Sequence, residues 1–150
     1  MTLPNGITPE QLLKEAKLAR QNAYTPYSHC RVGAALLAND GKIHRGCNIE
    51  NAAFGPTVCA ERVAIFRAIG DGARKGDFAA IAVVGSKETE TKGLFPPCGV
   101  CRQVLREFCD PAHMIVVLEN DDGTPFLLTL ADLLPHSFGP DFLCSEEGIE

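Results

Sequence analysis

Three cysteines and one glutamate stand at spacings that suit metal chemistry. The stretch PPCGVC carries Cys98 and Cys101 three positions apart, and the upstream stretch CAE carries Cys59 two positions before Glu61. A Cys-x-x-Cys pair occurs in redox switches, in structural zinc sites and in catalytic sites, so the pair alone does not decide its own use. The remaining residues of the chain have to separate these chemistries.

Both cysteine segments are predicted to lie at helix starts. An apolar pattern predicts one helix from residue 57 or 58 to about 69, and another from about 98 to just before Asp110-Pro111. Free backbone N–H groups and the positive end of the helix dipole favour thiolate over thiol at such positions. Three thiolates from two helix starts, with a fourth place open, describe a catalytic zinc site, and Glu61 is placed to move protons there.

Two other uses of the cysteines remain as alternatives. The first is a closed structural zinc site with Cys47 as the fourth ligand, and the second is a thioredoxin-like redox pair. Both leave Glu61 without a role beside Cys59, although a first-turn glutamate can also serve the helix dipole alone. The four histidines, at positions 29, 44, 113 and 136, show no ligand spacing. We therefore favour the catalytic interpretation.

The elements that position these residues follow from turn signals and apolar periodicity. The capping pattern Thr8-Pro9-Glu10-Gln11 predicts a helix that runs to about Tyr24, and Asn39-Asp40-Gly41 predicts the turn of a hairpin. The further elements expected are strands 32–37, 43–48 and 78–85, the two helices described above, strands 114–118 and 126–129, and a short helix 130–134. This order predicts one α/β domain over residues 1–150, with three layers (α/β/α) around a mixed sheet of about five strands and a mobile acidic tail after about residue 144.

Composition limits the partners of the chain. A net charge of -5 and a pI near 5.4 disfavour binding to nucleic acid, which requires Lys and Arg to neutralise phosphates. The sequence has neither an apolar run of membrane-spanning length nor a basic start followed by an apolar stretch. Seven cysteines form an odd set that does not resemble a disulfide framework. We expect a cytoplasmic protein with a small neutral substrate and with no nucleic-acid or membrane partner.

A longer pattern connects the cysteines to a known family. Cys-x-Glu followed by Pro-Cys-x-x-Cys is the signature of zinc nucleobase deaminases, and both halves are intact here as CAE at 59–61 and PCGVC at 97–101. The chain resembles a cytidine deaminase of the small homotetrameric type, from AYTPYS at 23–28 through GCNIENAA at 46–53 to LLPHSFGP at 133–140. The zinc signature alone fits several deaminases, whereas the stretch NIENA at 48–52 resembles the branch that acts on free nucleosides.

The resemblance implies hydrolytic deamination of cytidine and deoxycytidine to uridine and deoxyuridine, with release of ammonia, in pyrimidine salvage. It implies one zinc ion per subunit, with Glu61 moving protons and Arg62 donating hydrogen bonds to ligand sulfurs; Arg102 is a weaker candidate for the same donation. The implied zinc ligands are Cys59, Cys98 and Cys101. The alternatives are a deaminase of another aminopyrimidine, such as a nucleoside antibiotic or an RNA base, and a non-catalytic zinc-binding module.

The resemblance also implies the contacts to the substrate. Asn48 and Glu50 are expected to hold the ribose 3′-hydroxyl, and the backbone N–H of Ala60 is expected to meet the base carbonyl. The implied assembly is a homotetramer whose active sites are shared between subunits. The residues expected to reach in from neighbouring subunits are Ala52 and Phe54, towards the 5′-hydroxyl, and Phe138, onto the base.

Two positions depart from the pattern of the family. An aromatic residue is usual where this chain has Cys30, and Tyr is common where it has Phe54. A thiol cannot stack on a pyrimidine, and a stacked base contributes about 1 to 3 kcal/mol in nucleic-acid binders. We therefore expect a looser base pocket at Cys30, with KM raised roughly tenfold unless another side chain fills the place. A Cys30→Phe substitution should then lower KM, and the missing hydroxyl of Phe54 should remove one contact to the 5′-hydroxyl.

Overall fold

A mixed sheet of five strands forms the middle layer of the molecule. In the computed structural model, which describes residues 2–87 and 93–144, the strands lie in the order β2-β1-β3-β4-β5. The pair β3 and β4 is parallel, and the other neighbouring pairs are antiparallel. The bounds are β1 Cys30–Ala38, β2 Ile43–Cys47, β3 Phe78–Lys87, β4 Ile115–Glu119 and β5 Pro125–Thr129. The sequence-based fold class is confirmed, while the acidic tail after residue 144 lies outside the described residues.

Alternation along the central strands sends side chains into two separate cores. In β1, Val32 and Leu36 belong to one core, whereas Ala35 and Leu37 belong to the other. The same division recurs along β3 and β4, because neighbouring side chains of a strand point to opposite faces. Such strands are apolar on both sides, which explains why Phe78 to Gly85 forms a continuous apolar run.

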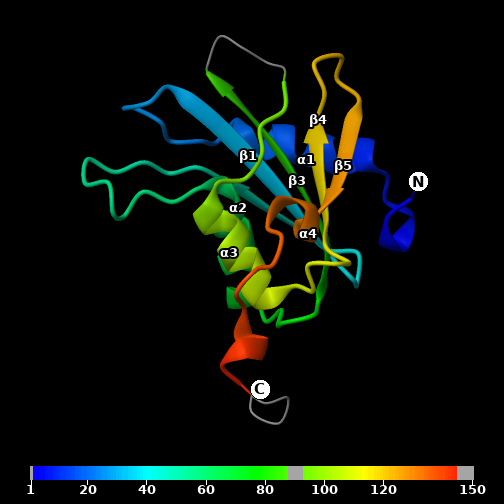
Figure 1. The fold of residues 1–150 in the computed structure, drawn as a ribbon. Coiled ribbons are helices and arrows are strands. Elements are labelled where there is room, and N and C mark those ends of the chain that lie inside the picture. Colours follow the sequence, from blue (N-terminus) through cyan, green and yellow to red (C-terminus); the bar gives the residue numbers. More distant parts are fainter. Residues whose placement is uncertain (1, 88–92, 145–150) are drawn as a thin grey trace.

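Helices cover both faces of the sheet. Helix α1 (Pro9–Arg20) packs into the core that contains Ala35 and Leu37, and it passes behind the sheet in Figure 1. Helices α2 (Ala60–Gly70) and α3 (Gly99–Phe108) contribute to the opposite core. The connections β2-α2-β3 and β3-α3-β4 therefore both cross the same face. The remaining helical segments are α4 (Leu130–Leu133), η1 (Pro4–Gly6) and η2 (Pro140–Phe142).

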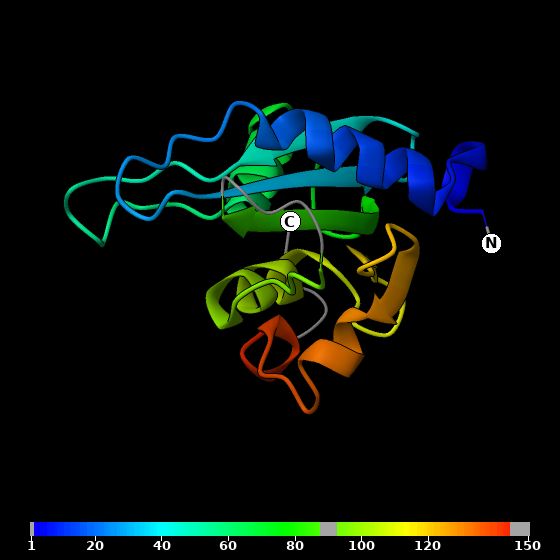
Figure 2. The same cartoon turned by 90° about the horizontal axis from the view of Figure 1, so that it is seen from above.

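Two long segments extend from the same end of the sheet. The segment between α1 and β1 and the segment between β2 and α2 project side by side in Figures 1 and 2. They are joined where Glu50 donates its backbone N–H to Tyr24 and Tyr24 donates to Asn48, at 2.9 and 3.0 Å. Within the described ranges, none of the helices combines the length and the apolar composition that crossing a membrane requires.

The predicted elements are all present, with differences at three places. Both halves of the capping box at Thr8 form as expected, but α1 ends at Arg20 instead of near Tyr24, because the backbone of Tyr24 is bonded to Asn48. The helix expected from residue 57 or 58 begins at Ala60. Its apolar residues predict burial on most sides, whereas Phe66 is 50% exposed. The apolar pattern of α3 predicts that Val100 points inward, whereas it is 57% exposed.

Two glycines let helices approach the sheet closely. A Cβ atom added at Gly33 would lie 2.0 Å from the Ala16 carbonyl oxygen of α1. A Cβ atom added at Gly46 would lie 2.3 Å from the Ala60 carbonyl oxygen and 2.5 Å from the Ala64 nitrogen of α2. Because Ala60 lies next to Cys59 and Glu61, the contact at Gly46 also sets where the start of α2 lies relative to the sheet.

Substitution of Gly46 tests this contact. We expect Gly46→Ala to reduce the free energy of unfolding by about 1–3 kcal/mol, because the added methyl group overpacks the interface of β2 and α2. Gly70→Ala is the matched control, since no atom lies within 4 Å of a Cβ atom added there. Denaturant unfolding measures both variants. Equal stability of Gly46→Ala and the unmodified protein would contradict the rigid contact.

Candidate metal centre and active site

Three thiols meet at one point of the structure. The Sγ atoms of Cys59 and Cys98 are 3.8 Å apart, and those of Cys98 and Cys101 are 3.5 Å apart. The three sulfur atoms all lie within 4.8 Å of one another. In the described part of the chain no histidine, carboxylate or further cysteine joins this group. Three sulfur donors at this spacing suit zinc with a fourth position left open.

Each side of the thiol cluster is the start of a helix. Cys59 is the N-cap of α2 and Cys98 is the N-cap of α3, and Cys101 follows in the first turn of α3. Neither N-cap side chain accepts a capping hydrogen bond from a backbone N–H group of its own helix. The sulfur atoms are therefore available to a metal, and the positive ends of two helix dipoles favour negative charge on them.

Hydrogen bonds concentrate negative charge on Cys59. The Cys101 thiol, and then the Arg62 guanidinium and the Cys98 thiol, lower the pKa of Cys59 to about 5, against burial that raises it. Arg62 Nη2 donates to Cys59 Sγ at 3.4 Å. The same hydrogen bond to Cys59, followed by burial, raises the pKa of the Cys101 thiol above its usual range. These hydrogen bonds favour the thiolate form at Cys59 and the thiol form at Cys101.

Glu61 is a buried carboxyl group beside the thiols. Its side chain lies on the second residue of α2 and is 4% exposed. Burial, the largest effect, raises the pKa of Glu61, while a hydrogen bond with Cys101 acts in the opposite direction. A carboxyl group whose pKa is raised by burial is better suited than an ordinary one to accept and return a proton.

A cavity of about 340 Å³ connects the thiol cluster to the predicted substrate residues. It is bounded by both helix starts, the beginning of β1 and the end of β2. Its lining contains six residues singled out from the sequence: Cys30, Asn48, Glu50, Cys59, Glu61 and Cys98. It also contains Pro96, the first residue of the stretch PPCGVC, and Phe95. The sequence did not indicate Phe95, because a loop residue before a motif carries no periodic signal of its own. Arg62 and Cys101 are not part of this lining.

The predicted ribose residues are held by the backbone around them. Glu50 Oε1 accepts hydrogen bonds from the backbone N–H groups of Tyr27 and Ser28, each at 3.1 Å. A hydrogen bond from the Ser28 side chain is the first cause of the lowered pKa of Glu50. Asn48 Oδ1 accepts from Val32 N–H, and Asn48 Nδ2 donates to the Cys30 carbonyl oxygen, both at 2.8 Å. The two side chains therefore reach the cavity already oriented.

Four predicted contact residues do not line the cavity of their own chain, three of them exposed and one, Ala60, buried. Phe54 is 92% exposed on the projecting segment before α2, and Ala52 lies exposed on the same segment. Phe138 is 56% exposed and stacks on Phe142, with ring centroids 5.6 Å apart. By contrast Ala60, at the first position of α2, is fully buried.

Arg102 does not donate to sulfur in the described structure. Its Nε donates to the Pro97 carbonyl oxygen at 2.7 Å, and its Nη1 donates to the Leu133 carbonyl oxygen at 2.6 Å. Arg102 thus joins the residues before Cys98 to the C-terminal part of the chain. Arg102 therefore bonds to backbone carbonyl oxygens and not to a ligand sulfur. Arg62 is the arginine that contacts the thiols.

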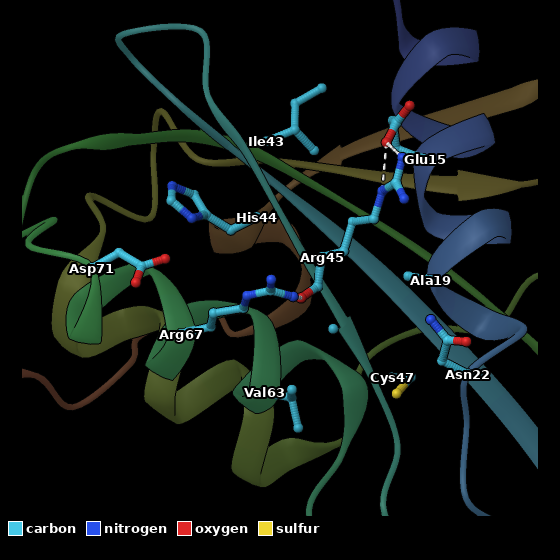
Figure 3. A pocket seen from close by; sticks show the side chains of 11 residues that line it. Glu15, Ala19, Asn22, Ile43, His44, Arg45, Cys47, Val63, Arg67 and Asp71 are labelled. Carbon is cyan, nitrogen blue, oxygen red and sulfur yellow. Dashed lines mark hydrogen bonds and ion pairs between the residues drawn. The ribbon is translucent and has the colours of Figure 1, made fainter.

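A larger hollow lies between α1, β2 and α2, away from the thiol cluster. It measures about 580 Å³, and Figure 3 shows Arg45 paired there with Glu15 and Arg67 pointing to the same strand. Cys47 lines this hollow and is not part of the thiol group. A closed structural zinc site with Cys47 as the fourth ligand is therefore not formed.

Comparison with known proteins gives the class to which this domain belongs. The family profile described as "Cytidine and deoxycytidylate deaminase zinc-binding region" matches residues 7–118. The class is thus that of zinc-dependent deaminases, in which a cysteine-held zinc works beside a conserved glutamate.

Individual relatives agree with this class. A cytidine deaminase from Sporosarcina psychrophila is 51% identical over 134 residues, which cover 89% of this chain and 93% of that protein. One from Halalkalibacterium halodurans is 51% identical, with coverage of 86% and 92%. The crystal structure of cytidine deaminase from Burkholderia pseudomallei matches with a TM-score of 0.80 and 51% identity, over 88% of this chain and 100% of that chain. The chain belongs to the cytidine and deoxycytidylate deaminase family.

The contact from Arg62 to Cys59 predicts a pH effect on zinc binding. We expect Arg62→Ala to raise the pKa of Cys59 from about 5, because a hydrogen bond and a positive charge that favour the thiolate are lost. Zinc binding requires thiolate, so the pH for half-maximal zinc binding should move upward by roughly one unit. Zinc titration of metal-free protein across pH measures the shift.

Arg67→Ala is the matched control for this prediction. Arg67 lies on the same helix but donates to the Arg45 carbonyl oxygen, away from the thiols. Its substitution should leave the pH dependence of zinc binding in place. Unchanged zinc content at every pH in Arg62→Ala, together with an unchanged pH–rate profile, would rule out the role assigned to Arg62.

Proposed function

We propose that this chain is a single catalytic domain that hydrolyses cytidine and deoxycytidine to uridine and deoxyuridine and releases ammonia. The observation that carries the proposal is the buried carboxyl group of Glu61 in one cavity with the thiol cluster. The family assignment supports it, as do relatives named cytidine deaminase at 51% identity. A neutral nucleoside also suits a chain of net charge -5.

The residues present fit zinc. Cys59, Cys98 and Cys101 supply three sulfur donors, and Arg62 offsets part of their negative charge. When bound, zinc supplies Lewis acidity that activates a water molecule for attack on C4 of the base. The chain itself supplies the thiolates, the compensating cation and a cavity next to them.

Glu61 is the proposed catalytic residue. Glu61 takes one proton from the attacking water and delivers it to N3 of the base, where it stays in the product. It then takes the second proton from the hydroxyl group formed at C4 and delivers it to the leaving amine. Water supplies the oxygen of the new C4 carbonyl, and the C4–N4 bond breaks to release ammonia. A raised pKa suits this exchange, because Glu61 then holds a proton more readily than an ordinary carboxyl group does.

The residues proposed for substrate recognition surround the same cavity. Asn48 and Glu50 are proposed to hold the ribose 3′-hydroxyl, with support from their fixed orientation beside β1. The backbone N–H of Ala60 is proposed to meet the base carbonyl, because the first N–H groups of α2 have no partner within the helix. Cys30 lines the wall of the cavity where the base would lie.

A shared active site in a homotetramer is proposed for Ala52, Phe54 and Phe138. Support comes from their exposure and their absence from the cavity of their own chain. Gln103 donates to the Phe138 carbonyl oxygen at 2.9 Å, and Arg106 donates to Ser137 Oγ, so the segment that carries Phe138 is anchored on α3. A cytoplasmic location is proposed because all seven cysteines are free thiols.

Replacement of Glu61 tests the reaction. We expect Glu61→Gln to lower deamination of cytidine by at least about a hundredfold, because the amide cannot carry the proton. Ammonia release and loss of cytidine absorbance measure this, and metal analysis should find zinc at the unmodified level. Full activity of Glu61→Gln, or no activity of the unmodified protein on either nucleoside, would contradict the proposal.

The same variant makes a prediction about stability. Because the pKa of Glu61 is raised in the folded protein, its carboxyl group contributes to the free energy of unfolding below the ordinary carboxyl pKa. This contribution is lost as pH rises through the raised value. Metal-free Glu61→Gln should therefore unfold at a temperature no lower than that of the metal-free unmodified protein above neutral pH. Thermal unfolding at several pH values measures the difference.

The mass in solution tests the shared site. Light scattering during gel filtration should give four times the mass of the 16.1 kDa chain. Phe54→Ala should reduce activity without loss of zinc, because it removes a contact supplied to a neighbour. A fully active monomer would contradict the shared-site arrangement.

A further inference from the structure

One aromatic ring borders the cavity of the thiol cluster. Of the lining residues that the structure describes, only Phe95 carries an aromatic side chain. Phe95 lies in the short connection that leads into α3, and it is half-buried against the core shared by α2, α3 and the sheet. The proposed reaction does not yet use this residue.

The sheet holds the Phe95 ring through a glycine. A Cβ atom added at Gly85 would lie 2.8 Å from Cδ1 and 2.9 Å from Cε1 and Cγ of Phe95. Any side chain larger than hydrogen at this position of β3 would therefore move the ring. The ring packs directly on the backbone of β3, which is more rigid support than a loop gives by itself.

The pairing of β1 with β3 places this ring near Cys30. Gly85 is opposite Val32, and Cys30 is the next residue of β1 on the same face, with both Cys30 and Val32 lining the cavity. Cys30 and Phe95 also pack against the same core. Cys30 has only a small thiol side chain, and Gly85 has no side chain. The space beside them on this face of the sheet is therefore left to the ring of Phe95.

The remaining lining defines what this ring would meet. The cavity lining contains Glu61 with two of the thiols, Cys59 and Cys98, and also the polar side chains of Asn48 and Glu50. A nucleoside whose C4 lies at the thiols and whose ribose lies at the polar groups presents its flat base to the wall between them. Aromatic side chains bind bases by stacking, which changes affinity roughly tenfold or more for each base.

We propose that Phe95 is the residue of this chain that contacts the pyrimidine base and sets its affinity, with Cys30 and Gly85 leaving the room that its ring requires. This inference rests on the proposed function, because it names the binding surface for the substrate of that reaction. It revises the expectation of an empty place at Cys30, since Phe95 fills it.

Replacement of the ring is the first test. Phe95→Leu in the zinc-loaded protein should raise KM for cytidine roughly tenfold and should change kcat much less, because stacking serves substrate and transition state alike. The dissociation constant of uridine, the product, should rise by a similar factor in calorimetry. Phe95→Tyr keeps the ring and should stay within about twofold of the unmodified protein. Phe126→Leu makes the same change on β5, outside the cavity lining, and should leave KM unchanged.

The second test uses the two small residues. Gly85→Ala should raise KM although the ring of Phe95 is still present, because the added methyl group displaces the ring. If Phe95→Leu does not fold, Gly85→Ala takes its place in the test. Cys30→Phe alone should give no lower KM, whereas Cys30→Phe should partly restore affinity to Phe95→Leu. A severalfold lower KM for Cys30→Phe alone, or unchanged KM and uridine binding in folded Phe95→Leu, would overturn the inference. An unmodified protein inactive on cytidine would instead contradict the proposed function.

Discussion

The meeting of two helix starts on one face of the sheet is the constraint on which the rest of the structure depends. Cys59 and Cys98 are the N-caps of α2 and α3, and their sulfur atoms are 3.8 Å apart. The distance is short because both crossover connections lie on the same face and Gly46 lets α2 approach β2 closely. Two dipoles then favour negative charge at one point, and the next residues of α2 bring a buried acid and a compensating arginine.

Two consecutive residues of α2 differ in charge and in their effect on the site. Arg62 stabilises the thiolate of Cys59, while Glu61, on the preceding residue, is buried and keeps a raised pKa. Successive helical residues point about 100° apart, so one turn sends a cation behind the sulfur atoms and a carboxyl group into the cavity. A stabilised thiolate and a carboxyl group with a raised pKa, which metal ligation and the proposed proton transfer respectively require, thus depend on neighbouring positions.

Much of this arrangement could be predicted from the sequence, because the thiols and Glu61 stand at helix starts that caps and periodicity reveal. Other features depend on contacts that periodicity does not describe. Tyr24 leaves the helical pattern because its backbone bonds to Asn48, and Val100 is apolar yet no core reaches it. Phe95 gave no signal, since the position of a loop residue is decided by its partner, here the bare backbone of Gly85.

The side-chain amide of Asn48 serves both the cavity and the pairing of the strands. Its oxygen and nitrogen bond to the Val32 N–H and the Cys30 carbonyl oxygen, so the side chain copies a peptide unit and continues the pairing of β2 with β1 past Cys47. An aspartate would place a carboxylate against that carbonyl oxygen, and an alanine would leave two backbone groups without these bonds. The end of the cavity proposed for the sugar is therefore built into the register of the sheet. A substitution of Asn48 would disturb the pairing of the strands along with any contact to the substrate.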